Sequence, residues 1–312
     1  MSVRHVLSIA ELGPDNLAEI LERAYAIATG QAAGARPLEG RVVGIYFRRP
    51  STRTRTSFTV GALKLGAGTL HYGPGDLQLV TGETIGDTAR VLSGYIDILV
   101  VRTNESLAEM HAFAEQGRMA VINAMSDNEH PTQAVADMVT IREEFGRYEG
   151  IHVLYLGEGN NTAASLALAM AMTPGMRLTL VTPEGYGVPA DVLRVAQDFA
   201  TRSGSAVEQH HHIDRLPKNV DAVYTTRWQT MGEPKADADW QEKFAPFSVT
   251  ARLMAEVSKP AGTVFLHDLP AVRGGDTHDE VLDGPQSRAF RQAEHKLTSA
   301  MATLSWCVAN KS

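Results

Sequence analysis

Short hydrophobic runs alternate along this chain with segments whose apolar residues recur at helical spacing. The runs lie between turn-forming residues, which is typical of buried strands. Phe58, Ala62 and Leu65 show the helical spacing that follows the first run. This alternation predicts an α/β fold in which helices cover both faces of parallel sheets. Strands are predicted at 42–47, 68–72, 98–102, 120–123, 151–156, 178–182, 222–225 and 263–267, and helices near 14–24, 54–65, 85–94, 107–116, 131–146, 163–172, 190–202 and 297–308.

The pattern repeats in two halves, which predicts two doubly wound parallel-sheet domains linked by helices. The helix that follows His130 ends near Gly146, and a new strand starts at Ile151. We therefore place one domain at 1–148 and the second at 149–285. A closing helix within 286–312 could pack back on the first domain. Ligands of such sheets bind at the carboxyl ends of strands, so we expect the active site in the cleft between the domains.

Composition excludes several classes of protein. The chain has 312 residues, of which 44% are hydrophobic, but no apolar run is long enough for a membrane span and no signal-peptide pattern is present. Cys307 is the only cysteine, so no internal disulfide can form and a cytoplasmic location is predicted. The net charge of −7 argues against a general nucleic-acid partner. Local arginine clusters on an acidic chain indicate a small anionic ligand instead.

The densest of these clusters follows the first predicted strand. Ser51, Thr52, Arg53 and Thr54 fall where the strand turns into a helix. Unpaired backbone N–H groups and the positive end of the helix dipole meet at such a turn. Hydroxyls and a guanidinium added there predict a phosphate site. The alternative is a capped helix with solvated arginines.

Three further polar residues lie at or beyond strand ends. Arg102 ends one strand, His130 follows the next, and Gln133 lies about one helical turn after His130. Singly, Arg102 could be a structural ion pair and His130 a loop histidine. Together with Arg53 they could form an anion clamp with a neutral donor directed at a carbonyl oxygen.

Five segments in this order resemble those of the aspartate/ornithine carbamoyltransferase family, and the resemblance covers nearly the whole chain. The segments are 51–55, 102–103, 130–133, 157–161 and 267–270. The loop 76–83 and the tail segments 281–285 and 293–296 look like the ornithine branch. Each segment alone is weak, whereas the first three together are specific.

The resemblance implies carbamoyl transfer with no cofactor and no metal, in a homotrimer with active sites between subunits. It implies that Thr54, Arg102 and His130 are catalytic because they polarise the carbamoyl oxygen. Carbamoyl phosphate would be bound by Ser51, Thr52, Arg53, Thr54, Gln78, Arg102, His130, Gln133, Leu269 and Lys296. An amino-acid amine would be bound by Asn161, Arg227, Gln229, Thr230, Met231 and Asp268.

The acceptor segments depart from the ornithine branch. Thr226 stands where that branch has the Asp that holds the α-ammonium of ornithine, and Asp268 replaces a Cys. Lys296 replaces an Arg and loses its bidentate fork. Arg227 and Gln229 resemble the aspartate branch, where such residues bind an acceptor carboxylate.

We therefore expect an acceptor other than ornithine, for example a shorter diamino acid. The main alternative is an ordinary ornithine carbamoyltransferase that makes citrulline, in which Arg227 and Asp268 pair with each other or with neighbours. A non-catalytic carbamoyl-phosphate-binding regulator is a third.

Two other motifs carry weaker interpretations. Residues 157–159 could open a dinucleotide-binding turn, but Thr162 occupies the third glycine position. Residues 210–212 are three histidines that could bind a metal, and we predict a solvated polar loop there instead.

Overall fold

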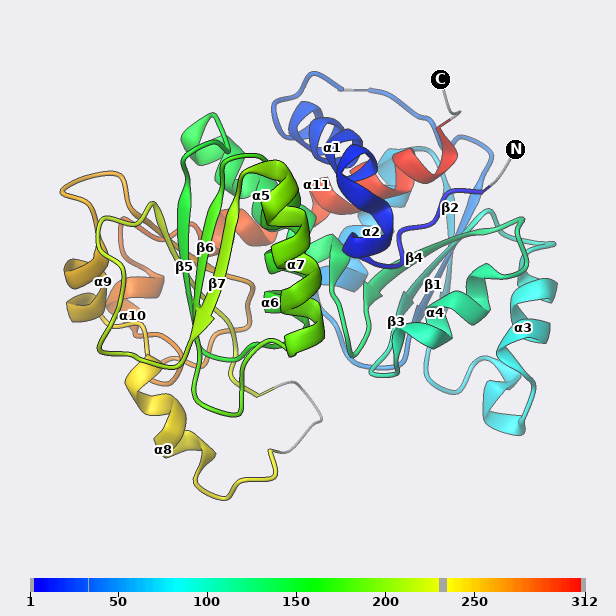
Figure 1. The fold of residues 1–312 in the computed structure, drawn as a ribbon. Helices are drawn as coiled ribbons and strands as arrows, with labels where there is room; N and C mark the ends of the chain where they lie inside the picture. Colours follow the sequence, from blue (N-terminus) through cyan, green and yellow to red (C-terminus); the bar gives the residue numbers. More distant parts are fainter. Residues whose placement is uncertain (1–2, 33, 230–234, 310–312) are drawn as a thin grey trace. The chain divides into compact units, whose positions relative to one another are not determined.

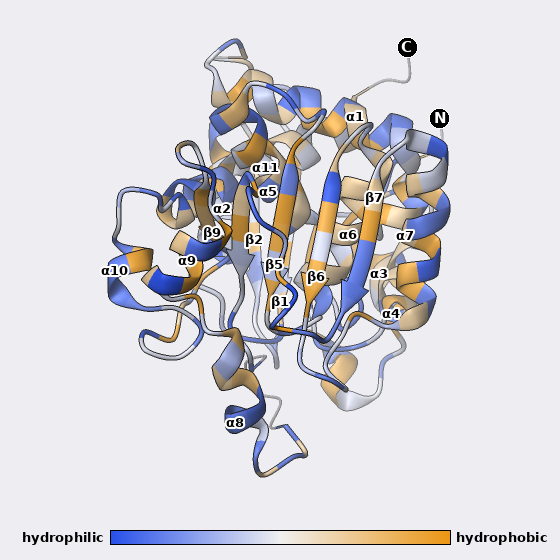
Figure 2. Ribbon diagram, turned by 60° about the vertical axis from the view of Figure 1, so that its left-hand side comes forward, coloured by the Kyte–Doolittle hydropathy of each residue, from blue (hydrophilic) through white to orange (hydrophobic). Residues whose placement is uncertain are grey.

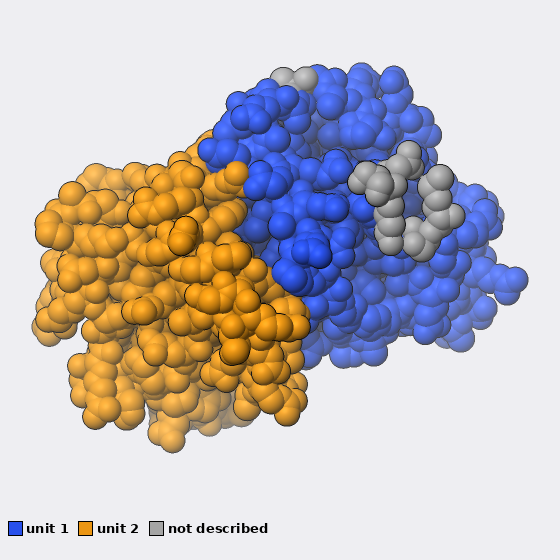
Figure 3. Space-filling view, turned by 45° about the horizontal axis from the view of Figure 1, so that its top comes forward, with its two compact units in different colours: residues 1–139, 294–312 blue, residues 140–293 orange. Residues whose placement is uncertain are grey.

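The computed structural model describes residues 3–32, 34–229 and 235–309. Helices and strands alternate through most of the chain (Figure 1). The chain divides into two compact units, which Figure 3 distinguishes by colour. Unit 1 comprises residues 1–139 and 294–312, and unit 2 comprises residues 140–293. Helices α5 (Pro131–Phe145) and α11 (Ala289–Val308) have residues in both units.

Unit 1 is built on a four-stranded parallel sheet in the order β2-β1-β3-β4. Every residue of β3 and β4 is buried, as expected where helices cover both faces of a sheet. Trp306 of α11 donates its indole N–H to Glu19 of α1 at 2.9 Å, which holds α11 beside α1. The other elements are β1 (Val42–Phe47), β2 (Gly68–Tyr72), β3 (Ile98–Arg102), β4 (Ala120–Met125), α1 (Ile9–Ala28), α2 (Arg53–Lys64), η1 (Gln78–Thr81), α3 (Ile85–Leu92) and α4 (Leu107–Ala114).

Unit 2 is built on a five-stranded parallel sheet in the order β7-β6-β5-β8-β9. The strands β5 and β6 are mostly hydrophobic, whereas the outer side of α7 is hydrophilic (Figure 2). The elements are β5 (His152–Leu156), α6 (Asn161–Met172), β6 (Arg177–Val181), α7 (Ala190–Ser203), β7 (Ala206–His210), β8 (Ala222–Thr225), α8 (Trp240–Phe244), η2 (Ala245–Phe247), α9 (Ala251–Val257), β9 (Val264–His267) and α10 (Asp279–Leu282).

The predicted fold class of two doubly wound parallel sheets is confirmed, and the eight predicted strands are present. Strand β7 and the short helices α8, α9 and α10 were not predicted. The interpretation of 210–212 as a polar loop is wrong for His210, which ends β7. The domain boundaries at 148 and 285 stay a prediction.

The structure also bears on membrane and metal binding. Among the described residues, no helix has both the length and the apolar character needed to cross a membrane. Within the same ranges, no three His, Cys, Asp or Glu side chains gather as a metal site would require.

Candidate active site

The start of α2 is open to a ligand. Strand β1 ends at Phe47, and Thr52 is the N-cap of α2. The Thr52 hydroxyl makes no capping hydrogen bond, whereas Ser8 and Asn160 cap the helices α1 and α6 with their side chains. The first N–H groups of a helix have no partner within the helix. The start of α2, next to the half-buried Ser51, therefore has the unpaired backbone N–H groups that the predicted phosphate site requires.

Arg102 lies beside this helix start. It ends β3, opposite Phe47 of β1 in the sheet register. Its guanidinium donates a hydrogen bond to the Thr54 hydroxyl at 3.4 Å, and both side chains are buried. A buried guanidinium is retained where it binds a partner of opposite charge or a developing negative charge. The structure thus brings Thr54 and Arg102 into contact, and Arg53 is the first residue of the same helix.

Arg48 has a different role from Arg53. Its Nε donates to the Tyr46 hydroxyl at 2.8 Å, and its Nη2 lies 2.9 Å from a Glu109 carboxylate oxygen. Glu109 is buried and also accepts from the Thr103 hydroxyl at 2.9 Å. Burial raises the pKa of Glu109, and the charge of Arg48 opposes that rise. Arg48 thus links the carboxyl ends of the two inner strands β1 and β3 through Tyr46 and Glu109.

His130 and Gln133 open α5 at the same end of the sheet. His130 is buried, and its pKa lies well below the ordinary value, first because of burial and then because of the charges of Lys296 and Arg102. The ring is therefore neutral near pH 7. Gln133 donates to Asp137 at 2.6 Å and accepts a hydrogen bond from the ammonium of Lys296. These bonds fix the orientation of the Gln133 amide.

Two further residues were predicted to bind the donor, Gln78 and Leu269. Gln78 is exposed on η1, where its side-chain oxygen accepts from the Thr81 hydroxyl at 2.8 Å. Leu269 belongs to unit 2 and has a left-handed backbone, with φ of 54°, before a cis peptide bond to Pro270. Left-handed backbone is unusual for leucine and tends to occur at functional sites. All other predicted carbamoyl-phosphate residues are in unit 1.

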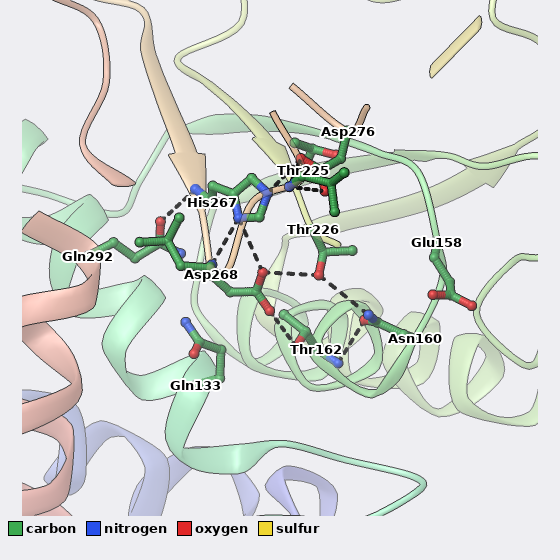
Figure 4. A network of polar contacts seen from close by, with 12 residues as sticks. Gln133, Glu158, Asn160, Thr162, Thr225, Thr226, His267, Asp268, Asp276 and Gln292 are labelled. Atoms are coloured by element: carbon green, nitrogen blue, oxygen red, sulfur yellow. Dashed lines mark hydrogen bonds and ion pairs between the residues drawn. The ribbon is translucent and has the colours of Figure 1, made fainter. Parts of the chain in front are cut away.

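Unit 2 contains a carboxylate held by two hydroxyls (Figure 4). Asp268 accepts from Thr226 at 3.0 Å and from Thr162 at 3.1 Å. Asn160 caps α6 with its side-chain oxygen and donates to the Thr226 hydroxyl at 3.4 Å. Since Thr225 pairs with His267 in the β8–β9 register, residues 226 and 268 leave adjacent strands side by side. The two departures from the ornithine branch are therefore direct neighbours.

The buried ring of His267 lies between two carboxylates of unit 2. Its Nδ1 accepts a hydrogen bond from the Leu269 N–H at 2.9 Å. Its Nε2 forms a 3.3 Å hydrogen bond with Asp276, and its Nδ1 lies 3.5 Å from an Asp268 oxygen. In the described ranges no lysine or arginine forms a salt bridge with Asp268.

Arg227 and Gln229 line a different surface. They border a pocket of about 540 Å³ that also includes Trp240 and His278 but not Asp268. Arg227 forms no hydrogen bond or ion pair with any residue that the structure describes, and its Nε is buried. It therefore does not pair with Asp268. Thr230 and Met231, also predicted to bind the acceptor, lie outside the described residues. Asn161 is the first residue of α6, directly after the Asn160 cap.

Some residues of the site were missed from the sequence. Thr162, which holds Asp268, and Asn160, which caps α6, were not chosen as binding residues. The capping role of Asn160 could have been found, because Asn directly before an apolar helical run is a frequent N-cap. The contact between Thr162 and Asp268 has no signal in the sequence, because it joins residues far apart in the chain.

Both halves of the chain match domains of one known protein family. Residues 4–143 match the model of the aspartate/ornithine carbamoyltransferase carbamoyl-P binding domain, and residues 149–307 match that of its Asp/Orn binding domain. The ornithine carbamoyltransferase of Symbiobacterium thermophilum is 42% identical over 310 residues, 98% of each chain. That of Caldicellulosiruptor saccharolyticus is 39% identical over 304 residues, 97% of each. The structure of ornithine carbamoyltransferase from Pyrococcus furiosus has a TM-score of 0.90 at 38% identity, covering 97% of this chain and 96% of its own.

Proposed function

Because this chain belongs to the aspartate/ornithine carbamoyltransferase family and is a carbamoyltransferase, we propose that it carbamoylates the distal amine of ornithine. The altered acceptor motif first suggested a shorter diamino acid. The names of the relatives favour ornithine instead, which was the alternative drawn from the sequence. A non-catalytic regulator has less support, because an anion sensor needs no group that polarises a carbonyl.

The donor half of the proposal uses the buried group of unit 1. The start of α2 and Arg53 would bind the phosphate of carbamoyl phosphate. Thr54, Arg102 and His130 would surround the carbamoyl oxygen and stabilise the negative charge that grows on it. A neutral His130 fits this task, because an uncharged imidazole ring still has one N–H group that can donate a hydrogen bond to the carbamoyl oxygen.

The transfer itself needs no nucleophile from the protein. The neutral amine of the acceptor attacks the carbamoyl carbon and forms a C–N bond. The C–O bond to phosphate then breaks, and the amine passes one proton to the departing phosphate. Catalysis would come from position and electrostatics.

The acceptor half of the proposal rests on one observation, the 3.0 Å hydrogen bond between Thr226 and Asp268. The ornithine branch that this chain resembles carries its carboxylate at the position of Thr226. Here the carboxylate comes from the adjacent strand and is held against that same position. We propose that Asp268 binds the α-ammonium of ornithine in place of the usual residue, with Asn161 beside it.

A panel of amines tests the acceptor. Phosphate release from carbamoyl phosphate would be measured with ornithine, 2,4-diaminobutyrate, 2,3-diaminopropionate, putrescine, lysine and aspartate. We expect the highest kcat/KM with ornithine. A higher kcat/KM with another amine would overturn ornithine as the acceptor and leave carbamoyl transfer intact. Carbamoyl phosphate binding without turnover of any amine would support the regulator. The homotrimer and the cytoplasmic location stay predictions.

A further inference from the structure

A lysine ammonium is enclosed by aromatic rings near the acceptor residues of unit 2. The Lys235 side chain is only 6% exposed. Its Nζ lies 4.7 Å from the ring centre of Tyr186, 4.8 Å from that of Phe244 and 5.6 Å from that of Trp240. Contacts of this length between a cation and a ring face are attractive, more so where water is excluded.

The same ammonium forms an ion pair with the carboxylate of Glu158. The Glu158 side chain is 16% exposed, so both charges are largely removed from water. Burying an ion pair removes the hydration of both charges, and an apolar pair of similar volume is often as stable. The pair is therefore weak evidence for a role in stability alone. Its position suggests a second role.

Glu158 belongs to the turn that carries the acceptor residues. Figure 4 shows Glu158 on the same turn as Asn160, which donates to Thr226. The Tyr155 hydroxyl donates to the Glu158 carbonyl oxygen at 2.8 Å, and the Gly159 N–H donates to the Tyr186 carbonyl oxygen at 2.8 Å. The turn is thus attached to the aromatic enclosure in two ways. The Glu158 side chain pairs with Lys235, and the Gly159 N–H bonds to the backbone of Tyr186.

We propose that Lys235 is a positioning residue for the amine acceptor. It holds Glu158 and, through the backbone of the 157–161 turn, places Asn160 and Asn161. The inference rests on the proposed acceptor site but does not depend on which amine the site takes. Without the cation, Glu158 would turn toward water and the turn would lose its attachment to α8.

The test compares three variants by steady-state kinetics. Lys235→Met keeps an unbranched apolar side chain against the rings and removes the charge. Lys235→Arg keeps the charge, and Glu158→Gln keeps the shape of the partner. KM and kcat would be measured for the best amine of the panel and for carbamoyl phosphate. Lys243→Met is the matched control, because Lys243 is a partly exposed lysine of α8 that pairs with Asp237 and Asp239.

We expect Lys235→Met and Glu158→Gln to raise the acceptor KM by about tenfold or more, since small displacements of positioned groups are costly. The KM for carbamoyl phosphate should not change, and Lys235→Arg should recover most of the loss. The double variant should be no worse than either single one, as expected for two members of one contact.

A lower melting temperature with an unchanged acceptor KM would overturn the proposal, and so would equal changes in both KM values. If Lys235→Met does not fold, Glu158→Gln tests the same link. Failure of ornithine in the wild-type panel is a separate result, because the variants are compared on whichever amine is turned over.

Discussion

The carboxylate of Asp268 and the hydroxyl of Thr226 form a 3.0 Å hydrogen bond across the ends of β8 and β9. Asp268→Asn keeps the shape of this side chain and removes its charge. We expect kcat/KM for ornithine to fall about 100-fold, or roughly 3 kcal/mol, because a buried charge pair is lost. Turnover of 5-aminopentanoate, which has no α-amine, should be unaffected. An equal loss for both amines would contradict the assignment of the α-ammonium to Asp268.

The double variant Thr226→Asp with Asp268→Cys moves the carboxylate back to the position used by the ornithine branch. If the two sites place the charge equivalently, the double variant should turn over ornithine far better than Asp268→Asn. Thr226→Asp alone gives two adjacent carboxylates, and Asp268→Cys alone leaves none at these two positions. A double variant as impaired as Asp268→Asn would mean that the rest of the pocket has adapted to Asp268.

Arg227 has no partner among the described residues, and the sequence predicts that it binds the acceptor carboxylate. Arg227→Met should lower kcat/KM for ornithine by about tenfold to 100-fold, as is typical when one charged partner is lost. Putrescine lacks a carboxylate, so its kcat/KM should be the same for the variant and the wild type. Equal effects on both amines would assign Arg227 to the neighbouring pocket that it lines with Trp240 and His278.

The charge of Lys296 is one cause of the lowered pKa of His130. The pKa of His130 is lowered by burial first, and then by the charges of Lys296 and Arg102. Lys296→Met removes one of these charges, so the pKa of His130 should rise. His130 would then become protonated at a higher pH, and the acid limb of the kcat profile should move to higher pH. The exposed Lys64, with the change Lys64→Met, is the control. An unchanged acid limb would show that His130 does not set it.

Gly159 is required by the close approach of two backbone segments. A Cβ at this position would lie 2.1 Å from the Val188 nitrogen and 2.3 Å from the Gly187 carbonyl carbon. These backbone atoms can move away only if the 187–188 segment is displaced. Gly159→Ala should therefore lower the free energy of unfolding of unit 2 by about 3 kcal/mol. Urea unfolding measures this, with Gly75→Ala as the control, because no atom lies within 4 Å of a Cβ there. Equal midpoints for the two variants would contradict the expectation.

Hydrophobic runs were sufficient to predict most of the fold, and β7 shows why they were not sufficient everywhere. In the segment Ala206–His210 only Val207 is buried, because the strand lies at the sheet edge and faces water on one side. A strand that buries so little has a weak hydrophobic signal. Helices α8 and α10 are too short to show a periodic pattern, and tertiary packing holds them.

The predicted site residues divide in the same way. The contact between Arg102 and Thr54 could be predicted, because one residue ends a buried strand, the other follows one, and the carboxyl ends of parallel strands share one edge of the sheet. The contact of Asp268 with Thr162 and that of Lys235 with Glu158 could not be predicted. Each depends on loop conformations that bring distant residues together, and no periodicity in the sequence encodes them.

The discontinuous composition of unit 1 has a consequence for biosynthesis. Its sheet is encoded before unit 2, but Lys296 and most of α11 are encoded after it. Unit 2 is continuous in sequence, from residue 140 to residue 293. The sheet of unit 1 is therefore made long before the helix residues that complete the unit. We expect part of its apolar surface to stay uncovered during synthesis until α11 has been made.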